Sequence, residues 1–462
     1  MLARRSLLVF AAVFATVFAA VFAAPLLAQS PNDSTIRAIL KERVDAGRFV
    51  GVVVGLVTRE GTRRVIAYEH NAGVQPFDGN TVFEIGSITK TFTAAILADM
   101  VRQGEVSLDD PVVKFLPAGT VIPARDGKQI TLLDLATQSS GLPGMPDNFK
   151  PKDATNPYAD YTVAQMYEFL GRYQLTRDIG SKYEYSNLGV GLLGHALALK
   201  AGKPYEALVT ERVLKPLGMN DTRITLTSAM EKHLAPGHAP DGAPAHNWDL
   251  PTLAGAGALR SSVNDMLIYI HANADSMSRP LGATLAMTHF ARRPGPSTQL
   301  MLGLAWHRLK GPGGTTLVWH NGGTGGYRTF TGYSEATGEG VVVLSNTAQS
   351  VDDIGMHLLD ASFPLAPVPK QRTAISLAAD VLDRYLGTFA ITPAFALTIT
   401  REGTQLYAQA TDQPRFALFA EKEDEFFLKV VDAQVSFTKD STGAVTGLVL
   451  HQNGANMKAV RK

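Results

Sequence analysis

The chain of 462 residues contains no cysteine. This absence excludes disulfide bonds, thiolate metal ligands, a cysteine nucleophile and a lipoprotein anchor. A chain without thiols meets no redox demand in an oxidising compartment, so a bacterial periplasm or the outside of the cell suits it.

An excess of either charge is also missing. Lys plus Arg number 43 and Asp plus Glu number 42, so the chain offers no basic field to a nucleic-acid backbone or an anionic membrane. We therefore expect no nucleic-acid partner. Two motifs are absent as well, the Gly-x-Ser-x-Gly elbow of α/β-hydrolase esterases and the Gly-Lys-Ser/Thr of phosphate loops.

The composition is that of a globular protein. Hydrophobic residues make up 45% of the chain and charged residues 18%, which supplies enough apolar surface to bury. A length of 462 residues suits two domains.

Residues 1–28 predict a secretory signal peptide. Arg4 and Arg5 precede the apolar run Ser6–Ala24, and a break at Pro25 leads to the small residue Ala28 before the expected cleavage site. The alternative is an uncleaved anchor, since the run is long enough to span a bilayer, and only then is a membrane a partner. With cleavage, we expect a periplasmic or secreted protein.

Strand-like runs at both ends of the region 29–365 predict one antiparallel sheet. A helix capped by Asp33 and closed by Gly47 comes first, and residues 83–291 have helical periodicity with loops rich in Pro and Gly. The simplest assembly is an α/β (α+β) fold whose sheet carries an inserted helical lobe, with a substrate cleft between the two. The predicted strands are Phe49–Thr58, Arg63–Tyr68, Leu304–Leu309, Thr315–His320, Tyr327–Tyr333 and Val341–Leu344.

A second module is predicted after a linker. Residues 366–372 contain prolines that favour extended backbone, and residues 373–462 follow as a separate domain. Fewer than 100 residues of short, turn-punctuated strands fit a small β-barrel or a sandwich. These strands are Leu397–Ile399, Gln405–Ala410, Phe416–Phe419, Glu425–Val430, Gln434–Lys439 and Thr446–Gln452.

The first candidate motif is Ser87-x-x-Lys90, which opens a helix with one apolar stripe. At this spacing the two side chains rise on one face and can hydrogen-bond. A lysine buried beside a serine loses its preference for the charged form and can act as the base that the serine needs as a nucleophile. The helix N-terminus adds N–H groups for a developing oxyanion. On its own, the pair is more often an N-cap serine followed by a solvated lysine.

The second motif is Tyr185-x-Asn187, which precedes the apolar helical segment Leu188–Leu199. In an extended approach to that helix, the two side chains point the same way. A phenol can relay a proton, and an amide can hold a substrate amide carbonyl. The alternative is that Ser186 or Asn187 caps the helix and Tyr185 belongs to the core.

The third motif is the glycine-rich run His320–Gly326 at the end of a predicted strand. Glycines here let a substrate approach the strand edge closely, and the N–H near Gly323 is a candidate oxyanion donor. His320 is a candidate for binding a substrate carboxylate or tuning a proton relay. The alternative is a glycine-rich hairpin with a surface histidine.

In this order the three motifs resemble those of the penicillin-recognising serine hydrolases of the class C β-lactamase type. That superfamily includes β-lactamases, D-alanyl-D-alanine carboxypeptidases, D-aminopeptidases and β-lactamase-like carboxylesterases. The likeness spans Asp33 to Phe363 and includes the stretches Ile130–Pro143, Lys215–Met219 and Leu253–Gly257. It implies a β-lactamase/transpeptidase-like fold acting on β-lactams, D-amino-acid peptides or esters.

The resemblance also implies a role for each motif residue. Ser87 would be the acylated nucleophile, Lys90 and Tyr185 would share the proton transfers, and Asn187 would hold the substrate amide. The backbone N–H groups of Ser87 and Gly323 would form the oxyanion hole, and the strand His320, Asn321, Gly322 and Gly323 would bind substrate. His320 departs from true class C β-lactamases, which usually have lysine at this position. The resemblance therefore implies the mechanism more firmly than it implies β-lactamase activity, and antibiotic resistance depends on that activity.

The tail has its own resemblance, since Leu382–Phe389 is similar to the start of lipocalin-like domains appended to some of these hydrolases.

Two rival interpretations of the whole chain remain, and the first is a metal-binding enzyme of a different class. His233, His238 and His246 are close in sequence but match no common metal-ligand spacing, so we expect no metal and no cofactor. The other is a catalytically silent protein that binds cell-wall peptides. The sequence leaves the oligomeric state open.

Overall fold

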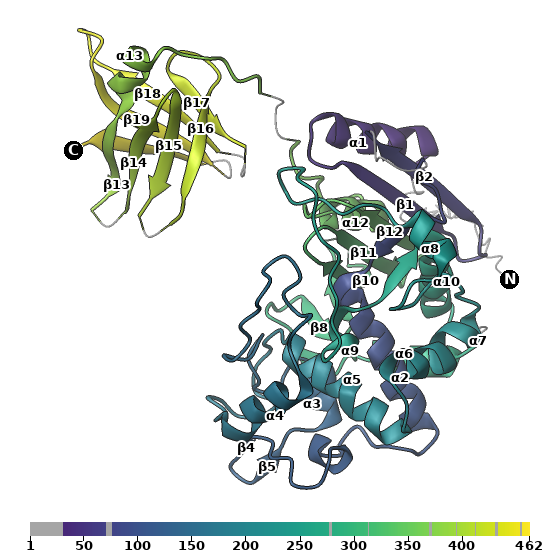
Figure 1. Cartoon of the computed structure of the whole chain (residues 1–462). Coiled ribbons are helices and arrows are strands. Elements are labelled where there is room, and N and C mark those ends of the chain that lie inside the picture. Colours follow the sequence, from purple (N-terminus) through teal and green to yellow (C-terminus); the bar gives the residue numbers. More distant parts are fainter. Residues whose placement is uncertain are drawn as a thin grey trace, which may run out of the picture.

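The computed structural model describes residues 31–70, 76–276, 280–312, 314–368, 372–393, 395–411, 413–429, 433–452 and 455–462. The predicted signal segment 1–28 and residues 369–371 of the predicted linker lie outside the described residues. Figure 1 shows a larger body of sheet and helices and a separate small barrel.

The larger body is organised around an eight-stranded sheet with the order β2-β1-β12-β11-β10-β9-β8-β7. Neighbouring strands are antiparallel, and β1 pairs with β12, which joins the early hairpin to the late strands in one sheet, as predicted. The predicted fold class is therefore confirmed. The strands are β1 (Gly51–Val57), β2 (Arg63–Glu69), β7 (Arg293–Pro294), β8 (Leu300–Leu302), β9 (His307–Lys310), β10 (Thr316–Gly323), β11 (Arg328–Ser334) and β12 (Gly340–Ser345).

Both faces of this sheet are covered, and β1 shows why. All seven of its residues are buried. Val52, Val54 and Leu56 pack into the cluster that includes the apolar residues of α1 (Asp33–Asp45) and α12 (Asp352–Leu359). Because side chains alternate along a strand, Val53 and Val57 point the other way, into the core of the helical lobe. An uninterrupted apolar run is what a strand buried on both faces requires.

The start of α1 differs from the prediction. Asn32, not Asp33, is the N-cap, because its backbone is extended and its side chain accepts a hydrogen bond from Thr35 N. Asp33 is the first helical residue, where its charge favours the helix N-terminus.

The helical lobe surrounds α2 (Thr89–Arg102), the helix that follows Ser87. The predicted buried helix is confirmed, and its burial extends beyond the predicted apolar stripe, since every residue from Thr89 to Met100 is buried. Neighbours on all sides, α5 (Asn187–Ala201), α9 (Ala254–Gly257) and α11 (Gly282–His289) among them, cover it. The other helices of the lobe are α3 (Leu132–Ala136), α4 (Val163–Arg172), α6 (Tyr205–Val209), α7 (Lys215–Leu217), α8 (Ser228–His233) and α10 (Val263–Ala274). Two small sheets pair β3 (Val82–Glu84) with β6 (Arg260–Ser262) and β4 (Ala124–Arg125) with β5 (Lys128–Gln129).

The second body is a closed antiparallel barrel, which decides between the barrel and the sandwich left open by the sequence. The two strands that close it, β13 and β20, were not among the predicted segments. Only Ala459 of β20 is buried, so this strand has no alternating apolar pattern to recognise. The strands are β13 (Gly387–Thr392), β14 (Phe395–Glu402), β15 (Gln405–Ala410), β16 (Arg415–Ala420), β17 (Glu425–Leu428), β18 (Ala433–Lys439), β19 (Val445–Gln452) and β20 (Ala455–Arg461).

Across the described ranges, no helix combines the length and the apolarity that crossing a bilayer requires.

Candidate active site

Ser87 lies in the short 3-10 turn η1 (Gly86–Ile88), between the strand β3 and α2. Gly86 has a φ of +50° in this turn, a conformation that favours glycine. A side chain there would also collide with β10, because an added Cβ would lie 2.6 Å from Gly323 N. The turn therefore presents Ser87 directly against the end of β10.

Lys90 is fully buried in the first turn of α2. Its Nζ lies 2.9 Å from Ser87 Oγ, 2.8 Å from Asn187 Oδ1 and 2.6 Å from the carbonyl oxygen of Ala256. Burial lowers the pKa of Lys90 well below its usual range. A neutral amine has two N–H donors and one lone pair, and two of its three neighbours can only accept. The lone pair is then left for the Ser87 hydroxyl, which makes Lys90 suited to act as a base.

Tyr185 approaches the same serine from the other side. Its phenol donates a hydrogen bond of 2.6 Å to Ser87 Oγ, and Lys90 Nζ lies 4.8 Å from the centre of its ring. Burial raises the pKa of Tyr185. The phenol therefore keeps its proton and serves as a donor in the resting site.

Asn187 belongs to the first turn of α5, and Ser186 is the N-cap, accepting from Gly189 N at 2.8 Å. The Asn187 side chain faces the site, as expected for a residue two positions after Tyr185. Its Oδ1 contacts Lys90, and its Nδ2 donates to the hydroxyl of Tyr158 at 3.1 Å. In this structure the amide thus orients the lysine.

His320 is buried on the face of β10 that packs against the helical lobe. Its Nδ1 lies 2.5 Å from the carbonyl oxygen of Asn321, and its ring stacks on that of His307 with a centroid separation of 5.0 Å. Burial lowers the pKa of His320 well below its usual range. His320 is therefore a neutral ring whose Nδ1–H donates to Asn321 O, and it is not among the residues that line the pocket at Ser87 described below.

Asn321 points to the opposite face of β10, as strand alternation requires. Its Nδ2 donates to Asp352 Oδ2 at 2.7 Å, on the side of α12. The structure therefore directs the side chain of this predicted substrate-binding residue away from Lys90, while other atoms of Asn321 line the pocket described below.

Gly322 and Gly323 bring the strand into contact with the serine turn. An added Cβ at Gly322 would lie 2.0 Å from the carbonyl oxygen of Ile85. Among the described residues, β9 pairs with Thr316–Trp319 and no strand pairs with that edge of residues 320–323, which therefore stays open. Thr324 N donates to Tyr327 O on the β11 side, so strand alternation directs the Gly323 N–H toward the open edge, where Ser87 lies.

A pocket of about 250 Å³ opens at Ser87. It is lined by Ser87, Tyr185, Trp248, Asn321, Gly322, Gly323, Thr324 and Arg328. Sequence reasoning missed Trp248, Thr324 and Arg328. The glycine-rich run pointed toward Thr324 and Arg328, which lie within it or just after it, but Trp248 comes from a loop without any recognisable motif.

His238, one of the three histidines considered as metal ligands, contacts the carbonyl oxygen of Asn346 through Nδ1 at 3.1 Å. In the part of the chain that the structure describes, no group of three or more His, Asp or Glu side chains is arranged to hold a metal ion.

Comparison with known proteins gives two family matches. Residues 36–363 match the Beta-lactamase family, and residues 371–460 match a domain of unknown function, DUF3471. The second match covers the barrel and carries no function in its description, so the lipocalin-like interpretation stays a prediction.

Three curated relatives illustrate the range. A protein named Beta-lactamase from Pseudomonas fluorescens is 29% identical over 350 residues, covering 68% of this chain and 92% of the relative. D-alanyl-D-alanine-carboxypeptidase/endopeptidase AmpH from Escherichia coli K12 is 32% identical over 265 residues, covering 54% and 67%. Penicillin-binding protein 4* from Bacillus subtilis 168 is 26% identical over 433 residues, covering 86% and 92%. Because the family match spans well over half of the chain, the protein belongs to the Beta-lactamase family of hydrolases.

Proposed function

We propose that the protein is a serine hydrolase that forms a covalent acyl-enzyme at Ser87, with β-lactams or related amides as substrates. The observation that carries the proposal is the contact of Ser87 Oγ with both a buried lysine, whose pKa burial lowers, and a buried phenol, whose pKa burial raises. A serine hydroxyl needs a base to attack a carbonyl and a donor to release the leaving group, and these two groups supply both functions.

In acylation, Lys90 Nζ takes the hydroxyl proton while Ser87 Oγ bonds to the substrate carbonyl carbon. The oxyanion that forms is held by the N–H groups of Ser87 and Gly323, and losing one such donor typically costs about 10²–10³-fold in kcat. Tyr185 then gives its proton to the leaving nitrogen or oxygen as the bond to the carbonyl carbon breaks, and the proton on Lys90 restores the phenol. Water hydrolyses the ester by the same steps with Ser87 as the leaving group.

The neutral His320 bears on the choice of substrate. A lysine at this position would offer a substrate carboxylate a positive charge, whereas His320 is neutral. The alternative to β-lactamase activity is D-alanyl-D-alanine carboxypeptidase or D-aminopeptidase activity, or short-chain carboxylesterase activity. Because a D-alanyl-D-alanine peptide ends in a carboxylate, the neutral ring favours only the substrates that lack one, such as short-chain esters. The names of the relatives cover β-lactamase and carboxypeptidase alike. A catalytically silent binding protein is the remaining candidate.

We further propose that residues 1–28 direct export, which would place the enzyme in the periplasm or outside the cell. The barrel would be a lipocalin-like appendage that shapes access to substrate or assembly. The short stretch Leu382–Phe389 supports this, together with the closed eight-stranded topology.

The test is labelling of the folded protein with a fluorescent β-lactam and a fluorophosphonate, followed by peptide mapping. We expect modification at Ser87 and none in Ser87→Ala. Rates on a chromogenic cephalosporin, a short-chain nitrophenyl ester and D-Ala peptides then rank the substrate classes, and Ser87→Ala should abolish all of them. Folded protein that neither reagent modifies at Ser87 would overturn the acyl-enzyme proposal.

A further inference from the structure

The carboxylate of Glu84 is buried three residues before Ser87, at the end of β3. Glu84 is 2% exposed and lies in register with Arg260 on β6, whose Nη2 donates to Glu84 Oε1 at 3.2 Å. Replacing a buried ion pair by apolar residues of similar volume is often neutral for stability. Stability alone is therefore a weak explanation for this pair.

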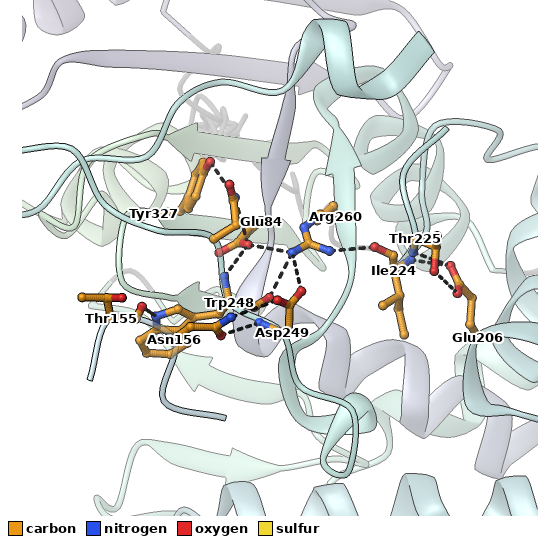
Figure 2. A network of polar contacts seen from close by, with 11 residues as sticks. Glu84, Thr155, Asn156, Glu206, Ile224, Thr225, Trp248, Asp249, Arg260 and Tyr327 are labelled. Atoms are coloured by element: carbon orange, nitrogen blue, oxygen red, sulfur yellow. Dashed lines mark hydrogen bonds and ion pairs between the residues drawn. The ribbon is translucent and has the colours of Figure 1, made fainter. Parts of the chain in front are cut away.

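The same carboxylate oxygen holds the loop that carries Trp248. Glu84 Oε1 accepts from Trp248 N at 2.9 Å and from Asn247 Nδ2 at 3.0 Å, and Asn247 Nδ2 also contacts the hydroxyl of Tyr327 at 3.0 Å. Figure 2 shows Glu84 between Tyr327 and Trp248, with Arg260 on its other side. Glu84 thus holds the Trp248 loop, and Asn247 of that loop contacts Tyr327, in the segment that follows the glycine-rich end of β10.

Trp248 is a wall of the Ser87 pocket. Its Nε1 donates to Thr155 O at 3.1 Å, and a Cβ added to Gly325 would lie 2.7 Å from that nitrogen, so the indole packs closely on the glycine-rich turn. Its ring also lies 5.3 Å from that of Tyr158, the residue whose hydroxyl accepts from Asn187. The position of Trp248 is therefore fixed from three sides, and the ion pair anchors its main chain: Glu84 accepts from Trp248 N, and Arg260 Nη2 donates to Trp248 O at 3.0 Å.

We propose that Glu84 is a positioning residue that fixes the Trp248 wall of the Ser87 pocket and thereby determines which acyl groups the pocket accepts. Glu84 does not line the pocket, so it acts through the main chain of Trp248. An acyl group large enough to reach the indole depends on this wall, whereas an acetyl group does not. The inference rests on the proposed acyl-enzyme at Ser87.

The test compares Glu84→Met, which removes the acceptor of Trp248 N and Asn247 Nδ2, with wild type in the full chain, using nitrophenyl acetate and nitrophenyl phenylacetate, which share a leaving group. We expect the ratio of kcat/KM for phenylacetate over acetate to fall at least fivefold, through KM, while kcat for acetate changes less than twofold. Glu206→Met is the matched control, because it removes the same charge and the same kind of acceptor at the far end of the network, where Glu206 accepts from Ile224 N and Thr225 N. This control should leave the ratio unchanged.

A second readout does not need activity. Acrylamide quenching of tryptophan fluorescence reports the exposure of Trp248 once the signal of the matching Trp248→Phe protein, which comes from Trp306 and Trp319, has been subtracted. We expect quenching of Trp248 to increase severalfold in Glu84→Met and to stay unchanged in Glu206→Met. If Glu84→Met does not fold, Asn247→Ala removes one donor to Glu84 without breaking the ion pair and should shift both readouts less, in the same direction.

Unchanged quenching in the folded Glu84 or Asn247 variant would overturn the inference. An unchanged ester ratio in an active enzyme, or an equal loss for both esters, would overturn it as well. A wild-type protein that hydrolyses neither ester and is not labelled at Ser87 would instead overturn the proposed function, and the quenching experiment would still test the position of Trp248.

Discussion

The substitution Gly322→Ala should separate β10 from the turn that carries Ser87. The added Cβ would lie 2.0 Å from the carbonyl oxygen of Ile85 and 2.5 Å from Thr329 Oγ1, whereas ordinary contacts of a Cβ begin at 3.4 Å. The carbonyl belongs to the main chain and already accepts from Thr329 Oγ1 at 2.9 Å, so one backbone must move by more than an ångström. A displacement of about 1 Å at a reacting group typically costs about 10²-fold in rate, or ~2.7 kcal/mol.

The expected outcome is a loss of about 10²-fold in kcat/KM on whichever substrate proves best, together with slower labelling of Ser87. Overpacking of this kind also destabilises a fold by about 1–3 kcal/mol, which a thermal melt followed by circular dichroism would detect.

Gly171→Ala is the matched control for the same change of residue. Gly171 lies within α4, and its added Cβ would be 3.9 Å from the nearest atom, in Val121. Alanine favours a helix by ~1 kcal/mol over glycine, so this variant should melt no lower than wild type and keep full activity. A Gly322→Ala enzyme with activity within threefold of wild type and an unchanged melt would refute the reasoning.

Three further predictions concern titration and proton transfer. Lys90 must be uncharged to act as a base and its pKa is lowered, so kcat/KM should fall as pH falls through the pKa of Lys90. Lys90→Arg keeps its charge and should be inactive across the whole pH range in the same rate assays. Tyr185→Phe removes the proton donor to Ser87 Oγ and should cost about 10²–10⁴-fold in kcat, with little change in a thermal melt; a loss below threefold would remove Tyr185 from the proton transfers. Burial raises the pKa of Asp265 to about 6 from 3.8, so the carboxylate stabilises the fold less once pH rises through about 6. Asp265→Asn keeps an acceptor for Asp221 N and Thr222 Oγ1 and should gain up to ~3 kcal/mol over wild type at pH 7.5, a gain that disappears below pH 4; melts of both proteins at the two pH values test this.

The chemistry of the site was predictable where it follows from short spacings. Ser87 and Lys90 share a helical turn, and Tyr185 and Asn187 alternate before a helix, so local geometry alone brings each pair together. The meeting of the two pairs depends on packing between distant segments. Their order along the chain and the family resemblance indicated it, and the hydrogen bond from Tyr185 to Ser87 is its result.

What the sequence could not indicate depends on contacts between loops and on the face of a strand. Trp248 lies in a loop without periodicity, and it lines the pocket because Glu84, from a different segment, holds its main chain. The direction of Asn321 follows from the register of β10, which no local pattern specifies. The full burial of α2 was likewise hidden, because its threonines are polar by composition but find acceptors inside the lobe, as Thr93 does with Gly255 O.

The open edge of β10 limits how the enzyme recognises a ligand. The four residues 320–323, which pair with β11 on their other edge, span about 13 Å, the length of roughly two dipeptide repeats of a second strand. A ligand laid along this edge is held by its main-chain amides, which every peptide and many acyl compounds possess. Recognition through main-chain groups does not depend on side chains, so the same strand can bind a broad set of acyl donors. Discrimination among those donors then depends on the residues that surround the strand.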